Sequence, residues 1–247
     1  MCIESEADLM GLCCAGRVVR IALDEMRALL RPGITTADLD VVAARVLKRY
    51  GARSAPEIFY GFPGTACISV NEEAVHGVPG SRRIVAGDLV TLDVTVELDG
   101  YVADAAMTIP VPPVTEEKKR LCSCAEFALE KALCTAQAGR PTRAIGRAVE
   151  EEVCRHGFEV LRELTGHGVG RSIHEEPHVP NFDDPGASAL LTEGLVIAIE
   201  PIISAGSATV FTADDDWTIA TSDGSLAAHF EHTIVVTRNR PYIVTAA

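Results

Sequence analysis

Residues 89–104 read LVTLDVTVELDGYVAD, and their pattern predicts two strands joined by a tight turn. The first strand covers residues 89–98 and the second residues 101–109, because both stretches are rich in residues that favour extended structure. Between them stands Asp99-Gly100, a dipeptide typical of two-residue hairpin turns. We therefore expect an antiparallel hairpin with at least one buried, apolar face.

The register of this hairpin brings two carboxylates together. If residue 98 pairs with residue 101, Thr95 faces Asp104, and Asp93 becomes a diagonal neighbour of Asp104 on the same face, about 7–8 Å away at most. An unpaired carboxylate in so apolar a run costs several kcal/mol. The two acids therefore either share a cation or repel each other, so that one of them holds a proton.

Two further acids stand in equally apolar surroundings. Glu200 follows the run LVIAI at residues 195–199, and Glu231 lies within FEHTIVV at residues 230–236. A single buried carboxylate is more often paired with a basic side chain than with a metal. Four such acids on separate strands, with few lysines or arginines near them in sequence, reverse that preference, and a metal is the better counter-charge.

Histidines add a possible nitrogen ligand. Glycines crowd His167 in TGHGVGRSIH at residues 165–174, which indicates close backbone packing rather than a helix. His76 lies in a similar turn of small residues, AVHGVP at residues 74–79. Taken alone, each histidine is more often structural. Three others are interpreted in that way: His156, His178 and His229.

Four carboxylates and His167 would form an oxygen-rich site whose formal charge balances two divalent cations. Such ligands suit Mn, Fe or Co better than a structural zinc ion, although Zn is also chemically possible. Two cations about 3.5–4 Å apart can activate a water and polarise a carbonyl, which is hydrolytic chemistry.

The rest of the chain is expected to form two related halves. Helices are predicted over residues 5–30, 36–50, 115–137 and 142–156, and further strands over residues 67–70, 194–204 and 227–237. Four residues recur 106 positions later: Gly33, Thr36, Leu39 and Gly51 match Gly139, Thr142, Ile145 and Gly157. We interpret the match as duplication, with coincidence as the alternative. The expected architecture is one α+β domain over residues 1–247, with pseudo-repeats at about 5–112 and 113–240 around a central cleft.

Composition narrows the class of protein and its compartment. A net charge of −13 argues against a general nucleic-acid binder, and 47% hydrophobic with 23% charged residues is typical of a globular protein. The first residues lack the pattern of a secretory leader, and no apolar stretch approaches the ~20 residues that span a bilayer. The eight cysteines show no Cys-x-x-Cys spacing, which favours reduced thiols. We expect a cytoplasmic protein that binds neither nucleic acid nor membranes.

As a set, these motifs resemble those of the type I methionine aminopeptidases, which have the pita-bread fold. The resemblance rests on Asp93 and Asp104 eleven residues apart, His167 with His174 seven later, IEP at 199–201, FEHTIVVT at 230–237, and CISVNE at 67–72 leading to His76. It runs from the first helix nearly to the C-terminus. It implies a metal-dependent hydrolase that removes N-terminal methionine from nascent proteins and peptides, preferentially when the second residue is small.

The resemblance also implies residue roles. The ligands of two divalent ions would be Asp93, Asp104, His167, Glu200 and Glu231, with Asp104 and Glu231 bridging the ions. Glu200 would shuttle the proton of the attacking water. His174 would steady the oxyanion or the scissile amide, and His76 would sit beside the substrate and assist the leaving nitrogen.

The family's methionine pocket maps onto five residues: Phe59, Phe62, Cys67, Ile173 and Trp217. An apolar slot with a sulfur neighbour suits a thioether side chain. The implied partners are the N-termini of peptides and nascent chains, a contact with the ribosome is left open, and a monomer is expected.

Five positions depart from the family pattern without removing a ligand: Ala103, Ala105, Ala198, Ile173 and Pro56. These residues leave fewer polar groups around the expected ligands and change the shape of the pocket. Their effect on rate, metal affinity and side-chain preference is left open. Two alternatives remain. One is a proline-specific aminopeptidase on the same fold, which usually carries an additional N-terminal domain. The other is a non-catalytic peptide-binding relative, which would lose metal ligands that this chain keeps.

Overall fold

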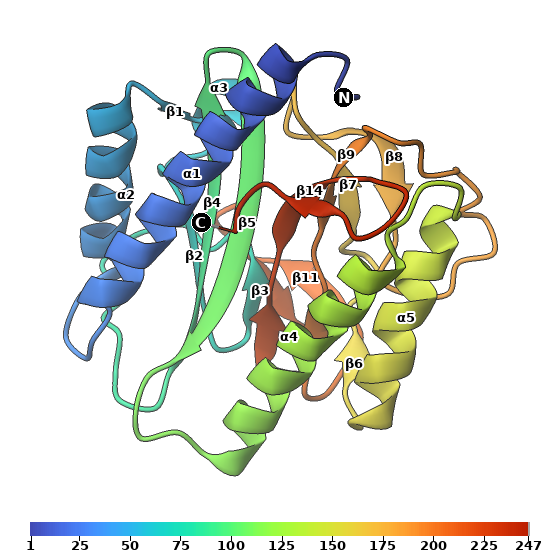
Figure 1. The fold of residues 1–247 in the computed structure, drawn as a ribbon. Coiled ribbons are helices and arrows are strands. Elements are labelled where there is room, and N and C mark those ends of the chain that lie inside the picture. Colours follow the sequence, from blue (N-terminus) through green and yellow to red (C-terminus); the bar gives the residue numbers. More distant parts are fainter. Residues whose placement is uncertain (247) are drawn as a thin grey trace.

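The four long helices form where apolar residues recur three and four positions apart. The computed structural model describes residues 1–246, and its long helices are α1 (Glu6–Leu29), α2 (Thr36–Tyr50), α4 (Glu116–Thr135) and α5 (Thr142–Arg155) (Figure 1). Thr35 begins α2 with a capping box, because it and Asp38 each accept a hydrogen bond from the other's backbone N–H. The sequence does not predict the short α3 (Ala55–Tyr60), because 6 residues are too few for a periodic pattern.

The predicted hairpin is confirmed in its bounds and its register. Its strands are β4 (Leu89–Leu98) and β5 (Tyr101–Pro110), which pair antiparallel with Thr95 opposite Asp104. Asp99 and Gly100 have φ values of 51° and 81°, the left-handed conformation that a two-residue hairpin turn requires. Asp93 and Asp104 consequently lie on one face of the hairpin.

The other strands are short. They are β1 (Arg53–Ser54), β2 (Cys67–Val70), β3 (Glu73–Val75), β6 (Glu159–Val160), β7 (Gly166–Gly168), β8 (Glu175–Val179), β9 (Val196–Ile199), β10 (Ile202–Ser204), β11 (Val210–Thr212), β12 (Ile219–Thr221), β13 (Ala227–His229), β14 (His232–Val235) and β15 (Tyr242–Ile243). One sheet joins β1, β4, β2 and β5, and another has the order β15-β14-β9-β7-β8. Two smaller sheets have the orders β13-β10-β6 and β11-β12-β3.

Two predicted strands are wrong as continuous elements. The stretch 194–204 breaks at Glu200 and Pro201 into β9 and β10, and the stretch 227–237 breaks at Phe230 and Glu231 into β13 and β14. Proline has no N–H to donate to a ladder, so the strand cannot continue unbroken there. Each broken strand leaves one sheet and enters another, β9 pairing with β14 and β10 with β13. Glu200 and Glu231 therefore stand where two sheets meet.

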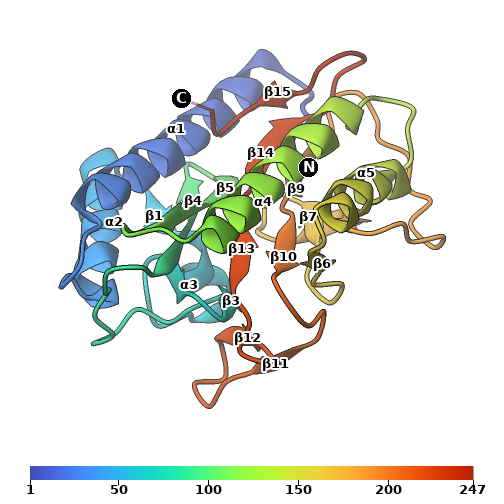
Figure 2. The same cartoon turned by 90° about the horizontal axis from the view of Figure 1, so that it is seen from below.

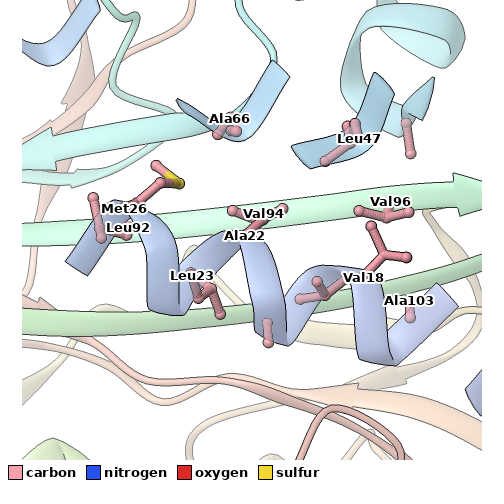
Figure 3. Packing of buried hydrophobic residues seen from close by; sticks show 14 of the residues in the cluster. Val18, Ala22, Leu23, Met26, Leu47, Ala66, Leu92, Val94, Val96 and Ala103 are labelled. Carbon is pink, nitrogen blue, oxygen red and sulfur yellow. The ribbon is translucent and has the colours of Figure 1, made fainter. Parts of the chain in front are cut away.

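The helices and the sheets form separate layers. Viewed from below, α1, α4 and α5 lie to one side of the strands, whereas β11 and β12 lie on the opposite side (Figure 2). Figure 3 shows Val18, Ala22 and Met26 of α1 packed beside the β4 residues Val94 and Val96, all of them buried. A second buried cluster joins α4 and α5 to β9 and β14. The two helix pairs therefore cover one side of the sheets. The opposite side remains to form the cleft.

Matching local features recur in the two helix pairs. Gly33 and Gly139 both have a positive φ, 93° and 87°, and each donates its N–H to a backbone carbonyl at 2.8 Å. Gly51 and Gly157, which follow α2 and α5, are also left-handed, with φ values of 69° and 76°. Glycine adopts this conformation without a steric penalty. These matches support the expected single domain of two related halves, which we retain as a proposal.

No helix in residues 1–246 is both long enough and apolar enough to cross a lipid bilayer.

Candidate metal centre and active site

The five expected ligands come together at one cavity of about 620 Å³. They are Asp93 of β4, Asp104 of β5, His167 of β7, Glu200 after β9 and Glu231 before β14. In the centre of this group, donor atoms of Asp104, His167 and Glu231 all lie within 4.8 Å of one another. These three side chains are buried, whereas Asp93 and Glu200 are half-buried and face the cavity.

Two carboxylate oxygens in this group are buried without a hydrogen-bond partner. Among the described residues, Asp104 Oδ1 and Glu231 Oε1 receive no donor, although each is shielded from solvent. A buried acceptor left unpaired costs about 1–3 kcal/mol and more when it is charged. A divalent cation would satisfy both oxygens, so the donor set fits a metal.

The electrostatics of the site also indicate that it binds cations. Desolvation is the largest cause that raises the pKa of all four carboxyls. The charge of Asp104 further raises the pKa of Asp93 and of Glu231. Four acids that resist ionisation together need positive charge, which bound cations would supply.

His167 is oriented as a metal ligand. Its Nδ1 lies 2.9 Å from the Gly168 carbonyl oxygen, to which it donates, so Nε2 faces Glu200 Oε1 at 3.3 Å. In metal-binding histidines, the ring nitrogen that does not bind the metal commonly donates such a hydrogen bond. Desolvation lowers the pKa of His167, but the hydrogen bond and charge of Glu200 outweigh it and raise the pKa to about 9. The protonated ring therefore places a positive charge beside the carboxyl groups.

Glycine on either side of His167 allows the backbone to pass close to its neighbours, as the sequence predicts. A Cβ atom at Gly166 would overlap the carbonyl oxygen of Ala198, and one at Gly168 would overlap that of Glu176. Only glycine fits both positions, so β7 can lie between β8 and β9 with His167 directed into the cavity.

A buried hydroxyl group connects β5, which carries Asp104, to β14, which follows Glu231. Thr233 Oγ1 of β14 accepts a hydrogen bond from the Asp104 N–H and donates one to the Asp104 carbonyl, both at 2.8 Å. The Glu231 N–H donates to the Ala106 carbonyl at 3.0 Å. These bonds set the spacing between the backbones at Asp104 and Glu231.

His76 and His174 also line the cavity. His76 has a φ of 56°, an uncommon conformation for a residue with a side chain, and the turn brings its ring to the cavity wall. The rings of His174 and His167 meet edge to face with centroids 4.3 Å apart. Desolvation, then the neighbouring His167 and His76, lower the pKa of His174 to about 4, so its ring is neutral near pH 7.

Four of the five residues expected in the methionine pocket line the same cavity: Phe62, Cys67, Ile173 and Trp217. Phe62 and Trp217 meet edge to face, with ring centroids 5.3 Å apart. Phe59 does not line the cavity and is 41% exposed. The next residue, Tyr60, lines the cavity instead, and its hydroxyl lies 2.6 Å from His174 Nδ1.

Sequence reasoning missed a sixth polar group at the centre. His229, interpreted as structural, is 1% exposed and lines the cavity, with Nε2 3.8 Å from Glu200 Oε2 and 3.7 Å from Glu231 Oε2. Desolvation lowers its pKa to about 3. Strand alternation could not indicate this position, because the strand ends at His229 and Glu231 lies in the break before β14. Of the other two histidines, His178 lines the cavity and His156 does not.

Comparisons with known proteins agree with the fold and the site. Metallopeptidase family M24 matches residues 11–238, and the chain belongs to this family. It is 45% identical to methionine aminopeptidase 2 of Bacillus subtilis, over 99% of both chains, and 42% identical to methionine aminopeptidase 1 of that organism, over 94% and 93%. The crystal structure of the methionine aminopeptidase from Thermotoga maritima superposes with a TM-score of 0.96 at 36% identity and covers 100% of both chains.

A proline-specific enzyme shares the fold more distantly. The prolidase of Pyrococcus horikoshii has a TM-score of 0.80 at 23% identity, with 63% of its chain covered. At that identity the likeness concerns the fold alone. The predicted pita-bread fold and the predicted family are thus confirmed, and the nearly full-length similarity lies with the methionine aminopeptidases.

Proposed function

We propose that this protein is a metal-dependent aminopeptidase that hydrolyses the first peptide bond and releases the N-terminal methionine. The observation that carries the proposal is the cluster of Asp104, His167 and Glu231, with Asp93 and Glu200 beside it, in a chain 45% identical over almost its whole length to a methionine aminopeptidase. Its substrates are the N-termini of peptides and nascent chains. A ribosome contact, a monomeric state and a cytoplasmic location stay predictions.

The same five residues would hold two divalent ions, with Asp104 and Glu231 shared between them. Oxygen-rich sites of this kind favour Mn, Fe or Co, with Zn as a further candidate. When bound, the ions polarise the scissile carbonyl and lower the pKa of water. Asp104 and Glu231 each have one carboxylate oxygen that accepts no hydrogen bond among the described residues and lies beside the other proposed ligands. These two oxygens support the bridging roles.

The remaining polar groups move protons and hold the substrate. Glu200 faces the cavity with a raised pKa, caused mainly by desolvation, and this suits a group that takes a proton from water and passes it on. His174 donates a hydrogen bond to the developing oxyanion, and His76, on the adjacent wall, assists the leaving nitrogen. Phe62 and Trp217 enclose the methionine side chain, and the sulfur of Cys67 lies in the same wall.

A paired-peptide assay tests this function. With Mn²⁺ or Co²⁺ added, we expect release of methionine from Met-Ala-Ser and little cleavage of an Ala-Pro peptide, because the apolar slot fits a thioether side chain. The free amino acid released from each peptide is measured over time, and the two rates are compared. A chelator should stop the reaction. A preference for the Ala-Pro peptide would assign the chain to the proline-specific enzymes, and binding without cleavage would indicate a non-catalytic relative.

Tyr60 positions His174 in this proposal. Its hydroxyl donates to Nδ1 of the neutral imidazole, so that the ring keeps its proton on Nε2, the nitrogen free to act as a donor. Tyr60→Phe removes only this hydrogen bond, and we expect kcat to fall about tenfold, or ~1.4 kcal/mol, with KM nearly unchanged. Steady-state kinetics on Met-Ala-Ser measure both constants.

The matched control for this prediction is Tyr50→Phe, which makes the same change at the end of α2, outside the cavity. It should have the rate of the wild type. If Tyr60→Phe instead raised KM and left kcat unchanged, Tyr60 would bind substrate rather than position His174.

A further inference from the structure

His229 lies beside the expected metal ligands, and its side chain makes no hydrogen bond within residues 1–246. Its backbone is fixed by Thr108, whose hydroxyl accepts from the His229 N–H at 2.8 Å and donates to the His229 carbonyl at 2.9 Å. Its side chain is buried, yet neither Nδ1 nor Nε2 has a hydrogen-bond partner anywhere in residues 1–246. A histidine that merely fills a core normally satisfies at least one nitrogen, because an unpaired buried polar group costs about 1–3 kcal/mol.

His229 Nε2 lies near carboxylate oxygens of two expected ligands. It lies 3.8 Å from Glu200 Oε2 and 3.7 Å from Glu231 Oε2, too far for a hydrogen bond to either carboxylate. Two donors that each bind one ion at about 2.0–2.2 Å lie roughly 3–4 Å apart, which is the separation seen here. Glu200 consequently stands between two imidazoles, with Oε1 facing His167 Nε2 at 3.3 Å and Oε2 facing His229 Nε2.

We propose that His229 is a second imidazole ligand of the metal centre and binds through Nε2 on the side of Glu200 and Glu231. This inference rests on the proposed function, since it concerns the same ions. A second nitrogen makes the donor set less oxygen-rich. Because imidazole favours the later first-row metals over Mn²⁺, His229 should shift the preference of the site towards ions such as Co²⁺ and Zn²⁺.

Metal titrations of the full chain, stripped with a chelator, test the assignment. Calorimetry with Mn²⁺ and with Co²⁺ gives an affinity for each ion in the wild type and in His229→Gln, which keeps a neutral polar side chain of similar length. We expect the variant to lose about tenfold or more in Co²⁺ affinity and much less in Mn²⁺ affinity. The visible spectrum of bound Co²⁺ should also change. His156→Gln, outside the cavity and bonded to the Glu152 carbonyl at 2.9 Å, should match the wild type.

A measurement on the unmutated protein makes the test independent of how the variant folds. Pulsed electron paramagnetic resonance of bound Mn²⁺ counts the coupled imidazole nitrogens, and we expect two histidines, His167 and His229. One histidine in the wild type, or an unchanged ratio of Co²⁺ to Mn²⁺ affinity in His229→Gln, would overturn the assignment and leave the proposed function intact. If the wild type bound no divalent ion, both the assignment and the proposed function would fail.

Discussion

Glu231→Gln should reduce the kcat/KM for Met-Ala-Ser by more than about 1000-fold with Mn²⁺ in excess, a loss of ~4 kcal/mol in transition-state stabilisation. Glu231 is buried, one of its oxygens has no partner among the described residues, and it lies within the cluster that Asp104 and His167 form. An amide keeps the shape of the side chain but cannot neutralise two cations. Steady-state kinetics across a metal titration measure the loss.

The same variant should be more stable than the wild type when both are metal-free. Desolvation, followed by the charges of Asp104, Glu200 and Asp93, raises the pKa of Glu231 well above its ordinary value. A carboxyl with a raised folded-state pKa loses stability as the pH rises from the unfolded pKa towards the folded one, and a glutamine does not titrate. The gain in the thermal midpoint should therefore widen with increasing pH.

The control for Glu231→Gln is Glu130→Gln, the same change on the exposed face of α4. It should leave the rate unchanged. Near-normal turnover by Glu231→Gln in excess metal would refute the bridging role proposed for this residue.

Gly168→Ala should lower the free energy of unfolding by more than about 3 kcal/mol, among the largest effects expected of a single methyl group. The added Cβ would overlap the backbone carbonyl of Glu176 in β8, and neither strand can move away without disturbing the pairing of β7 with β8 and β9. Chemical denaturation of the metal-free protein measures the loss. Because His167 is the preceding residue, metal affinity should fall as well.

Gly80→Ala provides the matched comparison. Its φ is not positive, and the nearest heavy atom to an added Cβ, the Val78 carbonyl oxygen, lies 4.0 Å away. The free energy of unfolding of this variant should lie within about 0.5 kcal/mol of the wild-type value. Equal stability of Gly168→Ala and Gly80→Ala would show that β7 tolerates displacement.

The central hairpin could be predicted from local sequence because its strands, turn and register are all local. Asp99-Gly100 forms the turn, and this turn fixes the register that places Thr95 opposite Asp104. The breaks at Glu200 and Glu231 could not be predicted in the same way, because an apolar run does not reveal which sheet each part of it joins. Pro201 was the local signal for one break, and the other depends on the tertiary pairing of β13 with β10.

The site was predictable where an ionisable residue interrupts an apolar run, as at Asp93 and Glu231. It was less predictable where the surroundings of a residue decide its role. Phe59 and Tyr60 are adjacent aromatic residues, and only the direction of the short α3 determines which of them lines the cavity. His229 has no unusual neighbours in sequence, and the role proposed for it depends on the pairing that brings it beside Glu200.

The places of the proposed ligands in the chain have a consequence for folding. Asp93 and Asp104 belong to the hairpin that precedes α4, whereas His167, Glu200 and Glu231 all follow α5. Any ion held by both groups acts as a non-covalent cross-link between segments far apart in the chain, and its binding energy adds directly to the cohesion of the native state. Scarcity of the ion would then weaken the enzyme's resistance to unfolding and proteolysis as well as its chemistry, so metal supply could set how much of the protein a cell retains.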